Sequence, residues 1–458
     1  MRRISLLLVM SACFACVALD NSKLVAALPT LARVAHASPT LERWIVEASL
    51  LVYASLLLMG GSLSERFGSR RMLLWGLAGF GATSLAGALT SSLYGLILAR
   101  AATGACTACV TPATLATLKH SFDDAERPRA IAIWTASFGV GASLGPLLAG
   151  LLVTRGGVAA VLLANLPPIA LCFWGSWRLV SADLPRRDVP LDWPGAALCL
   201  AAAGCLLFAI LGGPTHGWLG AEIVGSALGG ALCALGAVAW LKRARHPLFD
   251  LSLFAQRRFS RALLVILLGY FAFSGVSFVF AQYLQVARAK SAFESGLLSL
   301  PLAGSLLVGT LLAPAMMVRF GTERALLVSL GVALGGAALL ACASYGSGDV
   351  LVCASLLPFG IGCGSTFANA TELTLGSVPP ERGGTAGALS ESAFEYGGVL
   401  GVAGLSTVLG VASTDRQALL SCAPRAFWVG AFAVLCALLA AASLALRPSP
   451  VALNDARS

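Results

Sequence analysis

Apolar segments of membrane-spanning length recur along almost the whole chain of 458 residues. A helix needs about 20 mainly apolar residues to cross a hydrocarbon core about 30 Å thick. The chain is also 58% hydrophobic and only 11% charged, which is more apolar surface than a soluble protein of this length can bury. The sequence therefore predicts an all-α integral membrane protein with 14 transmembrane helices, in the segments 4–28, 42–63, 72–90, 93–118, 130–153, 157–179, 192–212, 219–241, 262–287, 295–317, 325–345, 350–373, 385–411 and 426–446.

The basic residues lie mainly on one side of this predicted topology. With the N-terminus in the cytoplasm, most Lys and Arg residues fall in the cytoplasmic segments, which is typical of a cytoplasmic-membrane protein. We therefore expect a multi-pass protein of the inner cell membrane with both termini cytoplasmic. The same distribution accounts for the net charge of +10, so nucleic acid is not an expected partner.

Similar motifs recur in the two halves of the chain at a nearly constant offset. RFGSRR at 66–71 resembles RFGTER at 319–324, and ATLATL at 113–118 resembles ATELTL at 370–375. A third pair is GVGASLGP at 139–146 and YGGVLGVA at 396–403. An internal repeat of this kind predicts two related six-helix bundles.

The repeat gives a predicted domain organisation of four parts. These are an N-terminal bundle at 1–179, two linking transmembrane helices with cytoplasmic loops at 180–261, a C-terminal bundle at 262–446 and a cytoplasmic tail at 447–458. Two pseudo-symmetric bundles around a central site are a common plan of secondary transporters.

The sequence shows no other source of energy for transport and no catalytic cluster. It lacks the G-x-x-x-x-G-K-[ST] phosphate loop that binds ATP. The 13 cysteines lie mostly within predicted spans, and the four histidines lie near loops. We expect no enzyme activity, no cofactor and no metal site, and an ion gradient as the driving force.

Five motifs resemble those of the major facilitator superfamily. GSLSERFGSRR at 61–71 resembles the G-x-L-x-D-R-x-G-R-R loop, RAATG at 100–104 resembles R-x-x-Q-G, and GASLGPLLAG at 141–150 resembles the antiporter motif G-x-x-x-G-P-x-x-G-G. LDNSKLVAALP at 19–29 resembles the first-span motif of the fourteen-span drug:proton antiporters. WIVEASLLVYASLLL at 44–58 resembles the second span of quaternary-ammonium and multidrug exporters.

This resemblance implies a major facilitator fold and a function. It implies a monomeric, proton-coupled transporter that exports small lipophilic or cationic drugs and toxic compounds through the lipid membrane. It also implies a cytoplasmic gating loop that latches the two bundles, made of Gly61, Glu65, Arg66, Gly68, Arg70 and Arg71. The antiporter motif comprises Gly141, Gly145, Pro146 and Gly150, where small residues permit close helix packing and proline bends the helix.

Charged residues inside the predicted spans are few, and such residues commonly mark proton or substrate pathways. A carboxylate that binds either a proton or a cationic substrate exchanges one for the other. We therefore predict proton-coupling and substrate roles, with Asp20 ranked first because it lies mid-span. The full set is Asp20, Glu47, Arg100, Glu391 and Glu395. For Arg100 the alternative is a static tie between helices.

Lys23 follows Asp20 by three residues and lies on nearly the same helix face. Either Lys23 pairs with Asp20 and keeps it ionised, or it points to the outer water and leaves Asp20 available. We favour the second arrangement slightly.

Two other functions remain open at this stage. The first is a dedicated exporter of one endogenous metabolite or antibiotic, and the second is a membrane receptor that transports nothing. A narrow substrate profile would indicate the first. The presence of the loop and antiporter motifs argues against the second.

Overall fold

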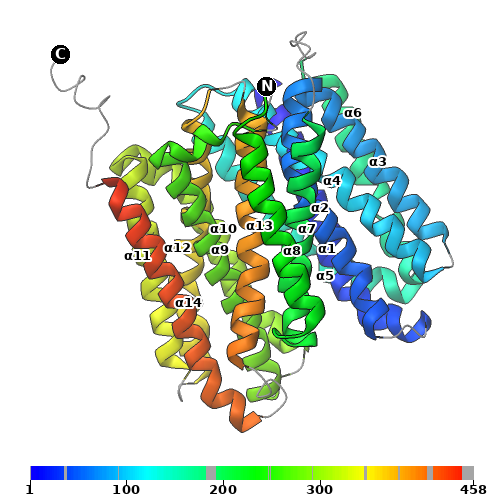
Figure 1. Ribbon diagram of the computed structural model, residues 1–458. Coiled ribbons are helices and arrows are strands. Elements are labelled where there is room, and N and C mark those ends of the chain that lie inside the picture. Colours follow the sequence, from blue (N-terminus) through cyan, green and yellow to red (C-terminus); the bar gives the residue numbers. More distant parts are fainter. Residues whose placement is uncertain are drawn as a thin grey trace. The chain divides into compact units, whose positions relative to one another are not determined.

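The computed structural model describes residues 2–35, 39–90, 92–181, 192–245, 247, 249–290, 292–344, 348–379, 382–409 and 416–445. These residues are helical almost throughout, and no strand occurs among them. The helices (Figure 1) are α1 (Arg2–Ala35), α2 (Pro39–Phe67), α3 (Ser69–Leu89), α4 (Leu93–Ser121), α5 (Arg127–Leu163), α6 (Leu166–Leu179), α7 (Trp193–His216), α8 (Ala221–Leu241), α9 (Arg257–Gln282), α10 (Ala292–Phe320), α11 (Thr322–Ala343), α12 (Asp349–Gly376), α13 (Gly383–Leu409) and α14 (Arg416–Ala445). A 3-10 helix, Leu251–Ala255, precedes α9, and a π-helical turn, Tyr283–Ala287, follows it.

Among the described residues, 13 helical segments are long and apolar enough to cross a membrane. Large apolar side chains also remain exposed on these helices, for example Leu228, Leu232 and Leu235 of α8. Exposed apolar side chains on helices with internally bonded backbones are suited to contact with hydrocarbon. The protein is therefore a multi-pass membrane protein.

The structure differs from the predicted spans around residues 130–179. The predicted segment 130–153 is part of α5 and is not one of the 13 apolar segments. The loop expected between 153 and 157 does not separate two helices, because α5 continues to Leu163. Gly157, inside α5, has a φ of 61°, a left-handed conformation that glycine adopts without strain. The break between α5 and α6 comes instead at Ala164 and Asn165.

The chain divides into two compact units. Unit 1 consists of Met1–Gly212, Gly217–Leu251 and Val378–Ser392, and unit 2 consists of Gly213–His216, Ser252–Ser377 and Ala393–Ser458. Helix α13 therefore contributes its first part to unit 1 and the remainder to unit 2. The domain boundaries expected at 179, 261 and 446 stay predictions, and the expected tail at 447–458 lies outside the described residues.

Within unit 1, α1 packs along α5, and α4 packs along α2 and α3. Small residues make these approaches close. A Cβ atom at Gly104 of α4, for instance, would overlap the carbonyl oxygen of Ser49 in α2. In unit 2, α12 packs along α10 and α11, and α9 packs along α14. Helices in membranes associate through such small-residue contacts because lipid supplies no hydrophobic drive between them.

Candidate functional site

Four buried polar side chains form a connected network in unit 1, which we call the buried network: Asp20, Lys23, Arg100 and Asn165. Asp20 and Lys23 lie on α1, Arg100 lies on α4, and Asn165 lies between α5 and α6. Each residue is at most 3% exposed. The network therefore joins four helices through polar groups in the interior of the unit.

Asp20 is the acceptor at the centre of the buried network. Arg100 Nη1 donates a hydrogen bond to Asp20 Oδ2 at 2.6 Å, and Asn165 Nδ2 donates to Asp20 Oδ1 at 2.6 Å. Both carboxylate oxygens are thus engaged by donors. A buried ion pair is stable only when additional hydrogen bonds satisfy its remaining groups, and Asn165 supplies one of them.

Lys23 joins this network through Asn165. Lys23 Nζ donates to Asn165 Oδ1 at 2.6 Å and to the carbonyl oxygen of Val161 at 3.0 Å. The expectation that Lys23 points to water is wrong, because it is 1% exposed. A direct pair with Asp20 is not formed either, since the amide of Asn165 stands between the two charges. The physical reason is that α5 packs closely on α1, so that Val161 near its end and Asn165 just beyond it offer Lys23 two oxygen acceptors.

Weaker contacts extend the network at its edges. Arg100 Nη2 donates to Asn21 Oδ1 at 3.3 Å, and Asn165 Nδ2 also lies 3.3 Å from Ser84 Oγ on α3. Ser84 is 2% exposed. Side chains of α1, α3 and α4 and of Asn165, between α5 and α6, therefore converge on Asp20 and its partners.

Asn165 is a site residue that sequence reasoning missed, because it lies inside the predicted span 157–179. The chain that follows it, Leu166-Pro167-Pro168, cannot continue α5, since proline lacks a backbone N–H and clashes with the preceding turn. The helix ends there, and Asn165 becomes the residue before α6. The signal available in the sequence is an amide side chain placed directly before Leu-Pro-Pro within an apolar segment.

The antiporter motif packs α5 against α1 beside the buried network. A Cβ atom at Gly145 would lie 2.5 Å from Ser22 Cβ and 2.8 Å from the backbone nitrogen of Lys23. A Cβ atom at Gly141 would lie 3.0 Å from the Cα atom of Ala15. Ser22 Oγ also donates to the carbonyl oxygen of Ala142 at 2.5 Å. Pro146 and Gly150 lie in α5 as well, but their surroundings lie outside the described part of the structure.

The gating-loop motif contacts the beginning of α13 within unit 1. The backbone N–H of Thr385, in the first turn of α13, donates to Glu65 Oε1 at 2.6 Å. A carboxylate at a helix N-terminus is stabilised by the unpaired N–H groups and by the helix dipole. Gly61 lies directly against Gly384 and Ala388, where a Cβ would approach Ala388 Cβ to 2.6 Å. Two positions near the end of α2 and three near the start of α13 therefore fit together.

The other residues of the loop motif shape the turn between α2 and α3. Gly68 has a φ of 94°, a conformation that side chains with a Cβ rarely adopt. Arg70 Nη2 donates to the carbonyl oxygen of Trp177 near the end of α6 at 2.6 Å. Arg66 lies over the ring of Phe67, and Arg71 is exposed. The arginines thus lie around the helix ends, where carbonyl groups attract cations.

Removing the Glu65 carboxylate is expected to loosen the start of α13. In Glu65→Ala the N–H of Thr385 loses its acceptor, at a local cost of about 1 kcal/mol. Hydrogen–deuterium exchange of the first turn of α13 should then accelerate several-fold. The matched control is Glu323→Ala, which removes an acid that pairs with Arg258 in unit 2. Equal protection of α13 in Glu65→Ala and the wild type would contradict the proposed contact.

The remaining predicted acids lie in different surroundings. Glu47 on α2 is half-buried, Glu391 on α13 is buried, and Glu395, further along α13, is half-buried. Glu391 belongs to unit 1 and Glu395 to unit 2. Asp20 contacts Arg100 and Asn165. The structure thus brings together Asp20 and Arg100 from the predicted set, and adds Lys23 and Asn165 to them.

Unit 2 contains an aromatic cluster formed by Tyr270, Phe273, Phe367 and Phe394, and Phe394 directly precedes Glu395 on α13. Ring centroids are 5.2 Å apart for Tyr270 and Phe394, and 5.5 Å apart for Phe367 and Phe394. Tyr270, Phe273 and Phe394 are half-buried. Aromatic faces attract cations, so this cluster offers a surface on which a flat cationic molecule can stack.

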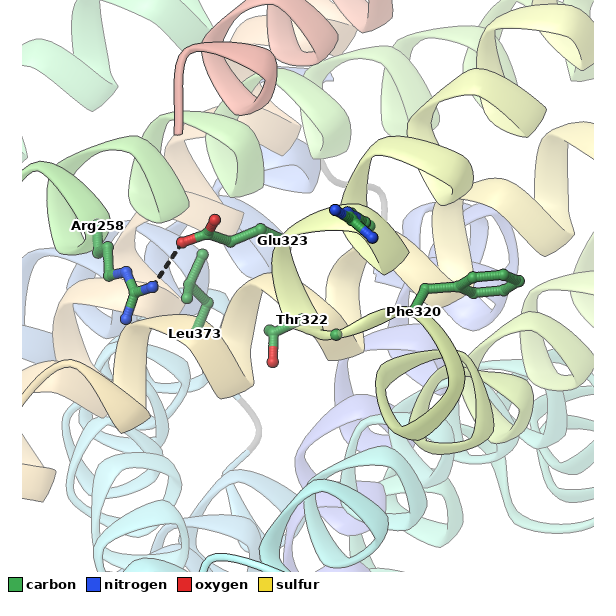
Figure 2. Close-up of a pocket in the computed structure, with 7 residues that line it drawn as sticks. Arg258, Phe320, Thr322, Glu323 and Leu373 are labelled. Carbon is green, nitrogen blue, oxygen red and sulfur yellow. Dashed lines mark ion pairs between the residues drawn. The ribbon is translucent and has the colours of Figure 1, made fainter. Parts of the chain in front are cut away.

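A pocket of about 300 Å³ lies at the second copy of the loop motif in unit 2 (Figure 2). Its lining residues are Arg258, Phe320, Gly321, Thr322, Glu323, Arg324 and Leu373. Figure 2 shows Arg258 and Glu323 pointing toward one another, and their charged atoms are 2.7 Å apart. Gly321 makes the turn with a φ of 78°. The pocket is charged and lies at helix ends, unlike the mainly apolar pockets that bind drug-sized molecules.

Long apolar helices in two compact units, with charged residues buried among the helices, are typical of a multi-pass membrane transporter. The family model described as "Major Facilitator Superfamily" matches residues 10–402. The chain belongs to the major facilitator superfamily.

The chain is similar to known resistance and transport proteins, of which three are described next. It is 32% identical over 403 residues to the tetracenomycin C resistance and export protein of Streptomyces glaucescens, covering 87% of this chain and 74% of the relative. It is 32% identical over 395 residues to the multidrug efflux pump LfrA of Mycolicibacterium smegmatis, covering 86% and 78%. The proton:xylose symporter XylE superimposes with a TM-score of 0.68 at 14% identity, covering 95% of this chain and 94% of that one. The last similarity shows the fold.

Proposed function

We propose that this protein is a proton-coupled secondary active transporter that exports hydrophobic or cationic toxic compounds. The buried network carries the proposal, because ionisable residues held inside a membrane protein mark proton or substrate pathways. Asp20 and Arg100 are a buried ion pair within an apolar helix bundle. The relatives named for drug resistance and multidrug efflux support the same function.

The proposed architecture has 14 spans, with two six-helix bundles joined by two linking helices and both termini in the cytoplasm. The 13 apolar helical segments support it, and α5 would supply the remaining span. The protein would act as a monomer in the inner cell membrane. It would need no cofactor, because the proton gradient drives it.

The proposed substrate contacts lie in unit 2. The half-buried rings of Tyr270, Phe273 and Phe394 would stack on a flat cation, and the carboxylate of Glu395 would attract its charge. Glu47 and Glu391 are further acids of the predicted coupling set. In this proposal the gating loop from Gly61 to Arg71 controls access on the cytoplasmic side.

The driving force is sufficient with one proton per substrate molecule. A membrane potential of about 100 mV supplies about 2.3 kcal/mol for each charge moved. Each pH unit adds about 1.4 kcal/mol per proton. Export of a neutral compound against a tenfold gradient needs about 1.4 kcal/mol.

Ethidium transport in inverted membrane vesicles tests the proposal. Wild-type vesicles should accumulate ethidium while a pH gradient is imposed and should lose it when an ionophore dissipates the gradient. Asp20→Asn should abolish uptake, because Arg100 then lacks its counter-ion. Asp123→Asn is the control, since Asp123 is an exposed partner of Arg3. If the ionophore does not change ethidium uptake by the wild type, transport is not coupled to protons.

A second candidate function is export of a single antibiotic or metabolite. The relative named for resistance to tetracenomycin C favours it. A panel of chemically unrelated substrates separates the two functions. Transport of one compound class, with no transport of ethidium by folded protein, would favour the dedicated exporter.

A further inference from the structure

The charges of the buried network do not balance when Lys23 is protonated. Asp20 contributes one negative charge, and Arg100 and Lys23 contribute two positive charges. All three residues are at most 3% exposed, so water does not screen the excess positive charge. An uncompensated charge in such a place is strongly disfavoured. The network is neutral only when one of its basic groups has released a proton, and arginine does not do so in proteins.

The hydrogen bonds of Lys23 fit the neutral amine. A neutral amine has two N–H donors and a lone pair, whereas an ammonium group has three donors. The structure provides two acceptors for Lys23 Nζ, the oxygens of Val161 and Asn165. Within the described part of the chain, no third acceptor for Nζ is found. Both donors of the neutral form are therefore satisfied, and the charged form has one donor left over.

The hydrogen bonds of Asp20 fit the ionised carboxylate. One oxygen accepts from the guanidinium of Arg100 and the other accepts from the amide of Asn165, each at 2.6 Å. A proton on either oxygen would displace one of these donors. Asn165 also has a defined orientation, because its nitrogen donates to Asp20 while its oxygen accepts from Lys23.

The groups that face Lys23 come from each helix around it. They are Asp20 and Cys16 on α1, Arg100 on α4, the Val161 carbonyl on α5, Asn165 before α6 and, behind the amide, Ser84 on α3. Helix α2, which also contacts α1, carries the half-buried Glu47. Asp20 and Arg100 carry opposite charges that offset each other at Lys23. Of the groups in the network, Lys23 is thus the one whose charge can change.

We propose that Lys23 is the residue of this network that binds and releases the transported proton, with Asp20 as its permanently ionised partner. The inference rests on the proposed proton-coupled export. In the binding step the Nζ lone pair takes a proton from hydronium, an N–H bond forms, and water is left. In the release step water takes the proton back. Lys23 replaces Asp20 here as the coupling group that the sequence ranked first.

Protonation of Lys23 would have two consequences for transport. It turns a neutral network into a positive one, which repels a cationic substrate and so makes proton and substrate binding mutually exclusive. It also creates a third donor that lacks an acceptor in the present packing of α1 on α5. The protonated protein therefore favours a different arrangement of these helices, and a conformational equilibrium shifts when a ligand binds one state better.

Lys23→Arg is the decisive variant, because arginine keeps the donors and the charge but does not release its proton. We expect folded Lys23→Arg to lose both ethidium binding and gradient-driven accumulation, because it keeps the network positive. Lys23→Met keeps the network neutral and should bind ethidium and exchange it across the membrane without a gradient, but lose gradient-driven accumulation to background. Gradient-driven accumulation by Lys23→Arg at the wild-type level would overturn the proposal. The matched control is Lys242→Arg, just beyond the end of α8, where accumulation should be unchanged.

A direct measurement on the wild type does not depend on transport or on variant folding. The chain contains four lysines, at 23, 119, 242 and 290, so selective 15N-lysine labelling gives a simple NMR spectrum. We expect the Lys23 side-chain signal to change between its neutral and charged forms within the pH range in which the protein stays folded. A Lys23 signal that stays charged throughout that range would overturn the proposal. If the wild type instead shows no gradient-driven transport, the proposed function fails, and the NMR titration still reports on Lys23.

Discussion

Replacing Arg100 by methionine is expected to lower the free energy of unfolding by about 3–5 kcal/mol. The guanidinium group is the direct cationic partner of Asp20, and both side chains are at most 3% exposed. Its removal leaves a buried carboxylate with one strong donor instead of two. Lys23 does not replace the guanidinium, because it reaches Asp20 only through the amide of Asn165. Unfolding of the purified protein in detergent, followed by its helical signal, measures the effect.

Two controls make this prediction specific. Arg3→Ala removes an arginine that also pairs with acids, Asp123 and Glu126, but does so at the surface. Exposed pairs contribute little, so its stability should stay close to that of the wild type. The double variant Asp20→Asn/Arg100→Met removes both charges and should recover much of the loss. If Arg100→Met is as stable as Arg3→Ala, the ion pair between Asp20 and Arg100 does not stabilise the folded protein.

Replacing Gly145 by alanine is expected to cost about 1–3 kcal/mol and to abolish transport. The added methyl group would lie 2.5 Å from Ser22 Cβ and 2.8 Å from the backbone nitrogen of Lys23, so α1 must move away from α5. That movement separates Lys23 from its acceptors on α5 and at Asn165. Thermal unfolding and gradient-driven ethidium uptake are the two measurements.

The control for Gly145 is another helical glycine whose Cβ would meet open space. Gly225 on α8 has no heavy atom within 4 Å of a Cβ position among the described contacts. Alanine is the better helix former by up to about 1 kcal/mol, so Gly225→Ala should be neutral or slightly stabilising. Normal stability and uptake in Gly145→Ala would show that α1 and α5 do not depend on this close approach.

The sequence by itself determined the class of the protein and most of its helices. Lipid contact imposes a local rule, since each span must be a long apolar helix whose backbone groups bond within the segment. Each span can therefore be predicted from its own residues, without knowledge of its neighbours. The turn at Gly68 is also a local feature, because the left-handed backbone there requires glycine whatever surrounds it. The loop and antiporter motifs likewise indicated the family, which the family model confirmed.

Around residues 130–179 the apolar segments alone did not predict where one helix ends and the next begins. Hydropathy placed the break between two spans near residue 155, whereas α5 runs on to Leu163 and the break comes at Asn165. Glycine at 157 accommodates a left-handed residue inside the helix, so the turn expected there does not end it. Asn165 lies inside the apolar segment Ala159–Leu179, which matches the predicted span 157–179, so hydropathy gave no sign of the helix break at this residue.

Only the tertiary structure decided how the buried charges are partnered. Asp20 contacts Arg100, which is 80 positions away in the chain, and Asn165, which is 145 positions away. Contacts at such separations produce no periodic pattern in the sequence. Spacing along α1 suggested that Lys23 either pairs with Asp20 or faces water. Packing of α5 on α1 excluded both, because it surrounds Lys23 with the oxygens of Val161 and Asn165. A charge inside a membrane protein takes the partner that neighbouring helices bring to it, and the helix that carries it does not specify which one.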